Sequence, residues 1–256
     1  MVNDHLSEQE ARRVTSLDRF KARTLCFFDI GMERKQLLDI GSGSGKFLLH
    51  NAGRYSRATG IEITPESVKF AREILTLDIV EEIQEVPGEI SAATAWHSLE
   101  HIPEQRLLDL LDGLSHKMPA GGRVIVSVPN AASWQYRWFG RAYAFYDVPN
   151  HLHQFTLGSL GSLMQRFGFR QVAAVNSWPY NTFGYTQGLL NILTHTHNYL
   201  YYRLKRRSGK PSLLLDAVNA LLLLLVVPAG WLFGWFDSLN LQRQGVITTC
   251  FEKSPC

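Results

Sequence analysis

The chain has 256 residues, 45% of them hydrophobic, and a formal net charge of +3. This length suits one α/β domain with an elaboration, or one domain and a half. So small a charge is not that of a strongly basic binding face, and we expect no nucleic-acid partner. The three cysteines form no Cys-x-x-Cys pair, which disfavours a zinc cage or redox motif and fits a reducing compartment.

Strand-like and helix-like segments alternate along most of the chain. In chain order, the patterns predict a helix over 8–30, a strand at 36–40, a helix at 44–54, a strand at 58–63, a helix at 64–75, a weak strand at 82–86, a strand at 92–97, a helix at 103–118, a strand at 123–128, a helix at 157–167, and strands at 171–175 and 246–251. Strands and helices at this spacing form βαβ units, so the predicted fold class is α/β with a mostly parallel sheet of seven strands flanked by helices.

Three glycines, Gly41, Gly43 and Gly45, stand at alternate positions between the first strand and the next helix. Glycine lets the backbone turn sharply and approach a ligand closely, and the helix N-terminus offers N–H groups to a carboxylate or a pyrophosphate. A Walker loop would need glycine at 40 and Ser or Thr at 47, where the chain has Ile40 and Phe47, so a phosphate loop is excluded. The dinucleotide fingerprint has its third glycine one residue later, which disfavours a dinucleotide.

Two acidic residues flank this glycine loop. Asp39 lies two residues before Gly41, where its carboxylate can face the ammonium of a methionine moiety. Glu62 ends the second strand, and a carboxylate there can accept both hydroxyls of a ribose. Both classes of cofactor require the second acid, so Glu62 alone does not decide between them.

The chain resembles the class I S-adenosylmethionine-dependent methyltransferases, in the branch of quinone-biosynthesis and bacterial small-molecule enzymes. The matching pieces are Leu-Asp-Ile-Gly-Ser-Gly-Ser-Gly at 38–45, Gly-Ile-Glu at 60–62, Trp-His-Ser-Leu-Glu-His-Ile-Pro at 96–103, Pro-Ala-Gly-Gly-Arg-Val at 119–124, Val-Pro-Asn at 128–130 and Asp-Val-Pro-Asn-His-Leu-His-Gln-Phe at 147–155. The resemblance covers about residues 30–178 and the last strand. It implies a Rossmann-like sheet and S-adenosylmethionine as the cofactor.

The resemblance also implies roles for individual residues of the cofactor site. Asp39, Gly41 and Gly43 would hold the methionine end of the cofactor, and the loop residues Ser42 and Gly45 are also predicted to bind it. Glu62 would hold the ribose and Ile63 would pack on the adenine. Trp96 and His97 would lie beside the methionine and the sulfonium. In the family an acidic residue usually follows the third strand, whereas here the segment 86–90 is short and no residue maps cleanly to the adenine.

Histidines are the candidate bases, because transfer to a hydroxyl or phenol needs a base near neutral pH. His101 follows the fourth strand, and His151 and His153 follow the fifth, on the acceptor side in this fold class. We predict all three as catalytic, with capping or packing as the alternative for His101 and a structural hydrogen bond as the alternative for the other two. Neither His151-x-His153 nor His195-x-His197 comes with a third ligand, so no metal site is expected.

Aromatic residues are dense between positions 131 and 146. They are Trp134, Tyr136, Trp138, Phe139, Tyr143, Phe145 and Tyr146. Such density predicts either a lid over an aromatic or lipid-like acceptor or a satellite hydrophobic cluster.

An apolar insert separates the last two strands. Residues 217–236 contain no Asp, Glu, Lys or Arg, and a helix of this length, roughly 30 Å, can span a bilayer. The last strand must rejoin the sheet, so a crossing would use two helices and would place the basic residues at 203–210 on the outer face, against the positive-inside tendency. We expect the insert to lie in or dip into the cytoplasmic leaflet. A dimer interface or an extra core helix is the alternative.

The predicted organisation is a methyltransferase domain at 1–178 and 241–256 with a helical apolar insert at 179–240. The predicted function is S-adenosylmethionine-dependent methyl transfer to a small-molecule, lipid-linked or quinone-like acceptor. The beginning of the chain carries no secretion signal, so we expect a cytoplasmic enzyme held at the inner face of the membrane through residues 180–240. A non-catalytic cofactor-binding membrane partner and, less favoured by the glycine spacing, an NAD-dependent oxidoreductase are the alternatives. The sequence does not specify an oligomeric state.

Overall fold

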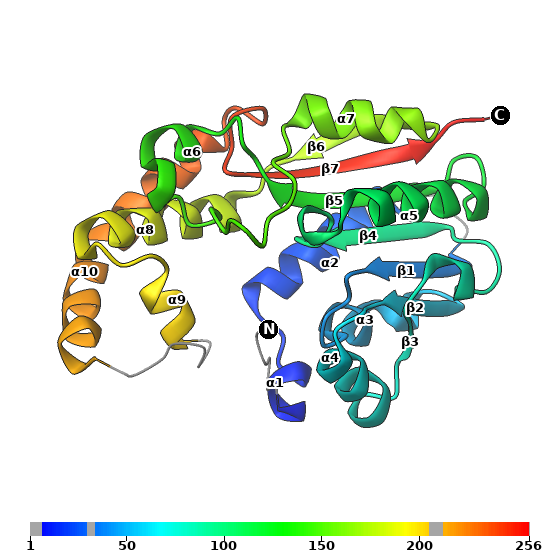
Figure 1. The fold of residues 1–256 in the computed structure, drawn as a ribbon, viewed down its shortest axis with the longest axis horizontal. Helices are drawn as coiled ribbons and strands as arrows, with labels where there is room; N and C mark the ends of the chain where they lie inside the picture. Colours follow the sequence, from blue (N-terminus) through cyan, green and yellow to red (C-terminus); the bar gives the residue numbers. More distant parts are fainter. Residues whose placement is uncertain (1–6, 30–33, 205–211, 256) are drawn as a thin grey trace. The chain divides into compact units, whose positions relative to one another are not determined.

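A seven-stranded sheet with the strand order β3-β2-β1-β4-β5-β7-β6 organises the computed structural model, which describes residues 7–29, 34–204 and 212–255. The strands are β1 (Gln36–Ile40), β2 (Arg57–Ile61), β3 (Asp78–Val80), β4 (Ala92–Trp96), β5 (Arg123–Pro129), β6 (Phe169–Val175) and β7 (Val246–Lys253). The four pairs among β1 to β5 are parallel, and Figure 1 shows β7 directed against β5. The predicted α/β fold with a mostly parallel sheet is confirmed.

The strand order reverses at β1, which pairs with β2 on one side and with β4 on the other. Because crossovers between parallel strands are right-handed, the connections on either side of β1 lie on opposite faces of the sheet. The loops after β1 and β4 therefore separate and leave a crevice at their carboxyl ends, the place where ligands bind in such sheets. Asp39, near the end of β1, is level with Thr94 of β4 across this switch point.

The single helix expected over 8–30 is wrong: two helices occupy this range, α1 (Glu8–Arg12) and α2 (Ser16–Phe28). The second begins at its own cap, since the Thr15 side chain accepts the N–H of Asp18 and the Asp18 carboxylate accepts the N–H of Thr15. This reciprocal capping box satisfies the free N–H groups of a new first turn, so the helical period is interrupted there.

The third strand is also misplaced by the sequence, which predicted 82–86. The strand is Asp78–Val80, with Ile79 buried and paired with Gly60 of β2. Residues 83–85 form a short 3-10 helix instead, in which Glu85 accepts the N–H of Glu82. Local hydrogen bonding by acidic side chains thus prevails over a weak strand pattern.

By internal contacts the chain forms two compact units. Within the described residues, the sheet unit comprises 7–29, 34–128, 158–174 and 248–255 and holds most of the sheet. Besides α1 and α2 its helices are α3 (Lys46–Asn51), η1 (Ala52–Arg54), α4 (Pro65–Lys69), the short π-helix η2 (Phe70–Ile74), η3 (Ile83–Glu85), η4 (Leu99–His101), α5 (Glu104–Lys117) and most of α7 (Leu157–Arg166).

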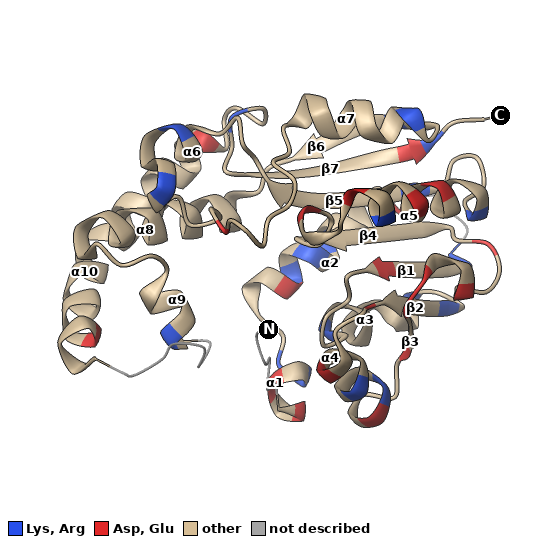
Figure 2. Ribbon diagram, in the orientation of Figure 1, with Lys and Arg blue, Asp and Glu red and all other residues tan. Residues whose placement is uncertain are grey.

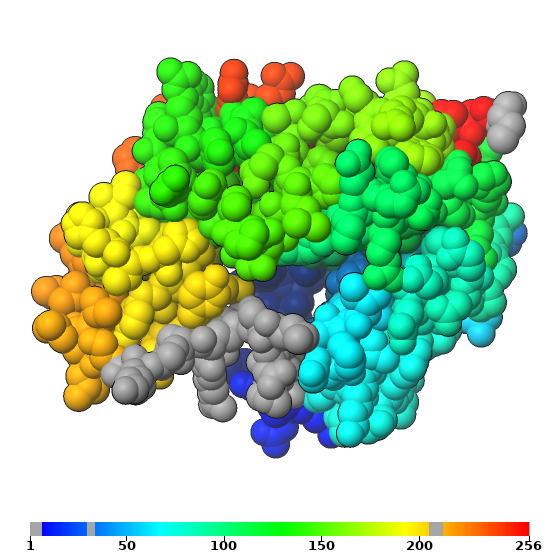
Figure 3. All heavy atoms as spheres, in the orientation of Figure 1, coloured from blue at the N-terminus to red at the C-terminus, as the bar shows by residue number. Residues whose placement is uncertain are grey.

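The insert unit comprises Pro129–Leu157 and Val175–Ile247 in the described part of the chain. Its helices are α6 (Trp134–Phe139), η5 (Gly140–Ala142), α8 (Trp178–Thr194), α9 (Tyr199–Leu204) and α10 (Leu213–Asp237). Figure 3 shows α8, α9 and α10, yellow to orange, packed against one another. The helical insert before the last strand is confirmed, and residues 129–157 join it through tertiary contacts. The division into domains at 179 and 240 stays a prediction.

Candidate functional site

The loop after β1 needs its glycines for two different reasons. Gly41, Gly43 and Gly45 all have positive φ, of 69°, 55° and 79°, which side-chain-bearing residues rarely adopt. A Cβ on Gly41 would lie 2.4 Å from Cβ of Ser98, so this glycine allows the loop after β4 to approach. A Cβ on Gly43 would meet no atom within 4 Å, so this position faces open space. The loop is therefore packed on one side and open on the other.

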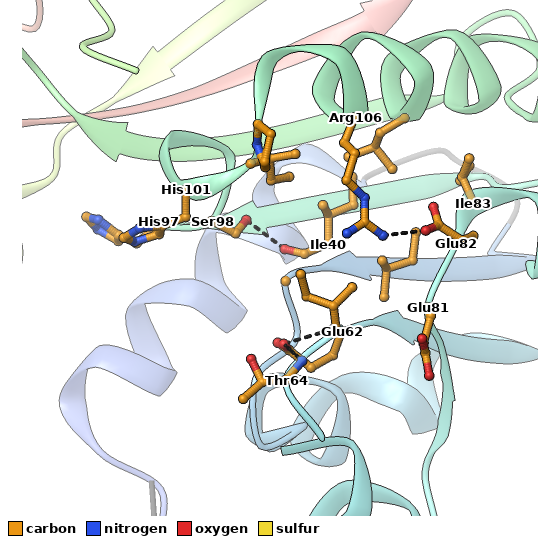
Figure 4. A pocket seen from close by; sticks show the side chains of 16 residues that line it. Ile40, Glu62, Thr64, Glu81, Glu82, Ile83, His97, Ser98, His101 and Arg106 are labelled. Carbon is orange, nitrogen blue, oxygen red and sulfur yellow. Dashed lines mark hydrogen bonds and ion pairs between the residues drawn. The ribbon is translucent and has the colours of Figure 1, made fainter. Parts of the chain in front are cut away.

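Glu62 follows β2 and holds this loop through hydrogen bonds to backbone N–H groups. Its Oε2 accepts the N–H of Gly43 at 2.7 Å, and its Oε1 accepts the N–H groups of Ile63 and Thr64 at 2.9 and 2.8 Å. A carboxylate that accepts three backbone N–H groups is held in one orientation. Figure 4 shows Glu62 on the wall of the cavity, next to Thr64.

Asp39 is buried in β1, where it accepts a 2.6 Å hydrogen bond from Oγ1 of Thr94. Burial raises the pKa of Asp39 to about 7; the Thr94 hydrogen bond and the charge of Lys21 oppose this rise, and the charge of Glu62 adds to it. The Lys21 Nζ atom also lies 5.3 Å from the ring centroid of Trp96. A basic group from α2 thus accompanies the two predicted residues Asp39 and Trp96, and no motif in the sequence pointed to it.

A cavity of about 330 Å³ opens at the carboxyl ends of β1 to β4 (Figure 4). Five of the predicted site residues line it, namely Gly41, Glu62, Ile63, His97 and His101. The remaining predicted cofactor residues, Asp39, Ser42, Gly43, Gly45 and Trp96, are not among its lining residues and belong to β1, β4 and the glycine loop. The structure therefore gathers the predicted cofactor residues around one end of the sheet unit.

Acidic residues follow the third strand after all. Glu81, Glu82 and Ile83 line the cavity directly beyond β3, and the Glu82 carboxylate forms an ion pair with Arg106 of α5. These acidic lining residues were not predicted, because the third strand was predicted to begin four residues too late and Glu82 was counted inside it. The run Asp-Ile-Val at 78–80 followed by two glutamates is the signal that could have found it.

The loop after β4 brings two ionisable groups together. His97 has a φ of 53°, and its Nδ1 lies 3.5 Å from Oε1 of the buried Glu100. The backbone N–H of His97 donates to the Ser127 carbonyl at 2.8 Å, and Oγ of Ser98 donates to the Ile40 carbonyl at 2.7 Å. These contacts fix the turn that carries His97 and His101 to the cavity wall.

The three predicted bases are divided between the two units. His101 is exposed on the cavity wall of the sheet unit. His151 and His153 belong to the insert unit, where the N–H of His151 donates to the Asp147 carbonyl at 2.7 Å and the ring of His153 stacks on Phe155. Their catalytic roles stay predictions.

The aromatic segment at 131–146 packs on α8. Its rings contact one another and those of Phe183 and Tyr185, as in the pairs Trp138–Tyr185 at 6.1 Å and Phe145–Phe183 at 5.8 Å. Such contacts favour the interpretation as a hydrophobic cluster. The role as a lid stays a prediction.

Comparison with known proteins shows the family to which the chain belongs. A family model described as "Methyltransferase domain" matches residues 9–174, more than half of the chain. The chain belongs to the S-adenosylmethionine-dependent methyltransferases. S-adenosylmethionine is the cofactor of this family, as predicted, and the NAD-dependent alternative is set aside. The match ends before α8, so the helices α8 to α10 lie outside it.

Individual relatives of this methyltransferase are distant. It is 25% identical over 138 residues to a ubiquinone biosynthesis O-methyltransferase of Xylella fastidiosa (strain M23), covering 49% of this chain and 55% of the relative. The enzyme of the same name from Dechloromonas aromatica (strain RCB) is 24% identical, with 49% and 59% covered. A putative sarcosine dimethylglycine methyltransferase from Galdieria sulphuraria shares the fold, with a TM-score of 0.59, 15% identity and 93% and 85% of the two chains covered. The methyltransferase thus spans little more than half the length of the curated relatives it matches.

Proposed function

We propose that this methyltransferase transfers the methyl group of S-adenosylmethionine to a small, membrane-borne acceptor of lipid-linked or quinone-like kind. The observation that carries the proposal is the surface of α10, where large apolar side chains from Leu213 to Phe236 are exposed. By length and composition α10 is the one helix in the described residues that could cross a membrane. The curated relatives, which act in ubiquinone biosynthesis by name, support an acceptor of this class.

The residues present fit the cofactor. The open space at Gly43 allows a ligand to lie directly against the loop backbone, and Glu62 presents a fixed carboxylate beside it for the two ribose hydroxyls. Asp39 offers a buried carboxylate whose ionised form would be stabilised by an ammonium group. When bound, S-adenosylmethionine supplies a methyl group on a positively charged sulfur.

The protein then has to hold the acceptor in line and take up its proton. Positioning supplies much of the acceleration in a displacement of this kind. We propose that His101, exposed on the cavity wall, accepts the proton of an acceptor hydroxyl through its imidazole. His151 and His153 remain the candidates from the insert unit.

Changes at these histidines test the chemical role. At saturating cofactor, we expect His101→Gln to lower turnover by about 100-fold or more, the range for loss of a general base. The His153→Gln variant is the comparison for a base from the insert unit. If turnover is unchanged in both variants, neither histidine acts as the base.

The proposed location is the cytoplasmic face of the membrane, with residues 180–240 as the contact. Fractionation of the full-length chain tests this. We expect the chain to sediment with membranes and to be released by detergent but not by high salt alone, because apolar contacts are not screened by salt. A chain that is fully soluble without detergent would contradict the membrane contact and leave cofactor binding untouched.

A further inference from the structure

The polarity of α10 is inverted relative to a helix of a soluble protein. A narrow seam faces the protein, and apart from Val226 it consists of polar residues and glycines: Asn219, Gly230, Gly234 and Asp237. The rest of the helix exposes apolar side chains, with Leu224 and Leu225 each 73% exposed. A water-facing helix shows the opposite arrangement, with its apolar stripe inward. The exposed face therefore matches a hydrocarbon environment.

Helix α8 packs against this seam and forms a layer between α10 and α6. Gly230 and Gly234 of α10 allow close contact with Thr186 and Thr182 of α8, because an added Cβ would lie 2.2 and 2.7 Å from their Oγ1 atoms. Gly188 of α8 in turn lies against the ring of Phe139 in α6. Residues two positions apart on a helix point about 200° apart, so α10 and α6 occupy opposite sides of α8. At the C-terminal end of α10 the two outer helices also meet, since Gln135 of α6 donates to the Asp237 carboxylate at 3.1 Å. Along the rest of α8 the order of layers is α10, α8, α6.

The α6 side carries two exposed arginines beside the exposed ring of Trp138. Arg137 in α6 and Arg141 directly after it are exposed, whereas α8 has no charged residue and is tan throughout in Figure 2. Asn191 of α8 donates to the carbonyl of Ala142 at 2.9 Å, which places Arg141 beside the C-terminal half of α8.

The two arginines define the orientation that a membrane would impose. The pairs Thr182–Gly234 and Thr186–Gly230 put residue 190 of α8 level with residue 226, next to the middle of α10. Were α10 upright in a bilayer, Arg141 would lie near the centre of a hydrocarbon layer about 30 Å thick, out of reach of either surface. Arginine is among the costliest residues to place there. An upright orientation is therefore incompatible with the layer order.

We propose that α10 lies flat in one leaflet, with its exposed face among the acyl chains, α8 at the headgroup level and α6 in water. This inference rests on the proposed membrane contact and specifies its geometry. The N-terminal end of α10 fits the headgroup region, since Asp216 accepts from Tyr199 Oη at 2.9 Å and from Arg203 Nε at 3.2 Å. The occupant of the surface is thus a lipid leaflet.

Charge indicates which lipids suit this surface. By sequence the insert unit holds eight Lys and Arg against three Asp and Glu, whereas the sheet unit holds eighteen against twenty. The excess of positive charge therefore belongs to the unit that carries α10. Four of the eight basic residues, those at 205–210, lie outside the described residues. Anionic headgroups are the complement of this unit.

Cysteine accessibility in the full chain tests the orientation. Single variants Leu224→Cys, Arg141→Cys and Tyr202→Cys are expressed in a bacterial host, with the unchanged chain as the background for its own cysteines. A membrane-impermeant maleimide is applied to spheroplasts, which expose the outer face, and to inverted vesicles, which expose the cytoplasmic face. We expect positions 141 and 202 to react only in inverted vesicles. Position 224 should react about tenfold more slowly than 141 until detergent is added, because hydrocarbon excludes the reagent.

Other outcomes overturn the inference in separate ways. Protection of position 141 in both preparations, with position 202 reactive in spheroplasts, would show an upright hairpin while leaving the membrane contact intact. Protection of position 224 in a soluble chain, without membranes, would show a contact between copies of the protein and would contradict the membrane contact itself. Flotation with phosphatidylcholine vesicles, with and without phosphatidylglycerol, tests the charge preference, and equal binding to both would refute it.

Discussion

Asp39 makes cofactor binding depend on pH in a direction that the structure determines. Burial raises the pKa of its carboxyl to about 7, so in the free protein it ionises only as the pH rises through that value. An ammonium group of the ligand favours the ionised form. With a pKa of about 7, the ionised fraction falls from about nine tenths at pH 8 to about one tenth at pH 6. We therefore expect the dissociation constant of S-adenosylhomocysteine to rise about tenfold over this interval.

Isothermal titration calorimetry at pH 6, 7 and 8 measures this change. Asp39→Asn is the matched control, since an amide can still accept the Thr94 hydrogen bond but does not titrate. We expect the variant to bind weakly at every pH, without the tenfold trend. The reasoning is refuted if the unchanged protein binds equally at pH 6 and pH 8, or if the variant shows the same trend.

Three further predictions concern the glycine loop and the insert unit. Glu62→Gln should raise the dissociation constant of S-adenosylhomocysteine about 10- to 150-fold, because a hydrogen bond to a charged group contributes about 1.5–3 kcal/mol; an unchanged constant by calorimetry would remove Glu62 from the site. Gly43→Ala should cost about 1–2 kcal/mol in the free energy of unfolding, as should Gly121→Ala, which has the same left-handed backbone in open space. Only the first should abolish cofactor binding, and equal binding by both variants would contradict the assignment of the open space. Burial raises the pKa of Asp237 to about 6, so folding favours its protonated form. The thermal midpoint relative to Asp237→Asn should therefore fall as the pH rises from about 4 to 6, and a constant difference would count against this.

Local patterns carried the prediction of the fold where the elements are long or chemically distinctive. Strong β-branched strands such as 123–129, the alternate glycines and the acid at Glu62 can be recognised because each has a local cause. The strand at 78–80 has only three residues and its neighbours are acidic, so the run Asp-Ile-Val before two glutamates is a short signal that the pattern of the capped turn after it outweighs.

Long-range contacts explain what no local pattern contains. Residues 129–157 join the insert unit because Asn130 donates to the carbonyls of Gln242 and Gln244, and because Tyr143 Oη donates to the Gly245 carbonyl. These partners lie about a hundred residues along the chain. The ion pair between Arg106 and Glu82 at the cavity likewise joins residues of different elements, so no local pattern predicts it.

Transfer of a labelled methyl group tests the central claim most directly. The full-length chain is incubated with methyl-labelled S-adenosylmethionine and bacterial membranes, and the lipids are then extracted into organic solvent. We predict that label enters the organic phase and that Gly43→Ala, which we expect to fold without binding the cofactor, gives none. Label confined to water-soluble products, or cofactor binding without any transfer, would contradict a methyltransferase that acts on a membrane-borne acceptor.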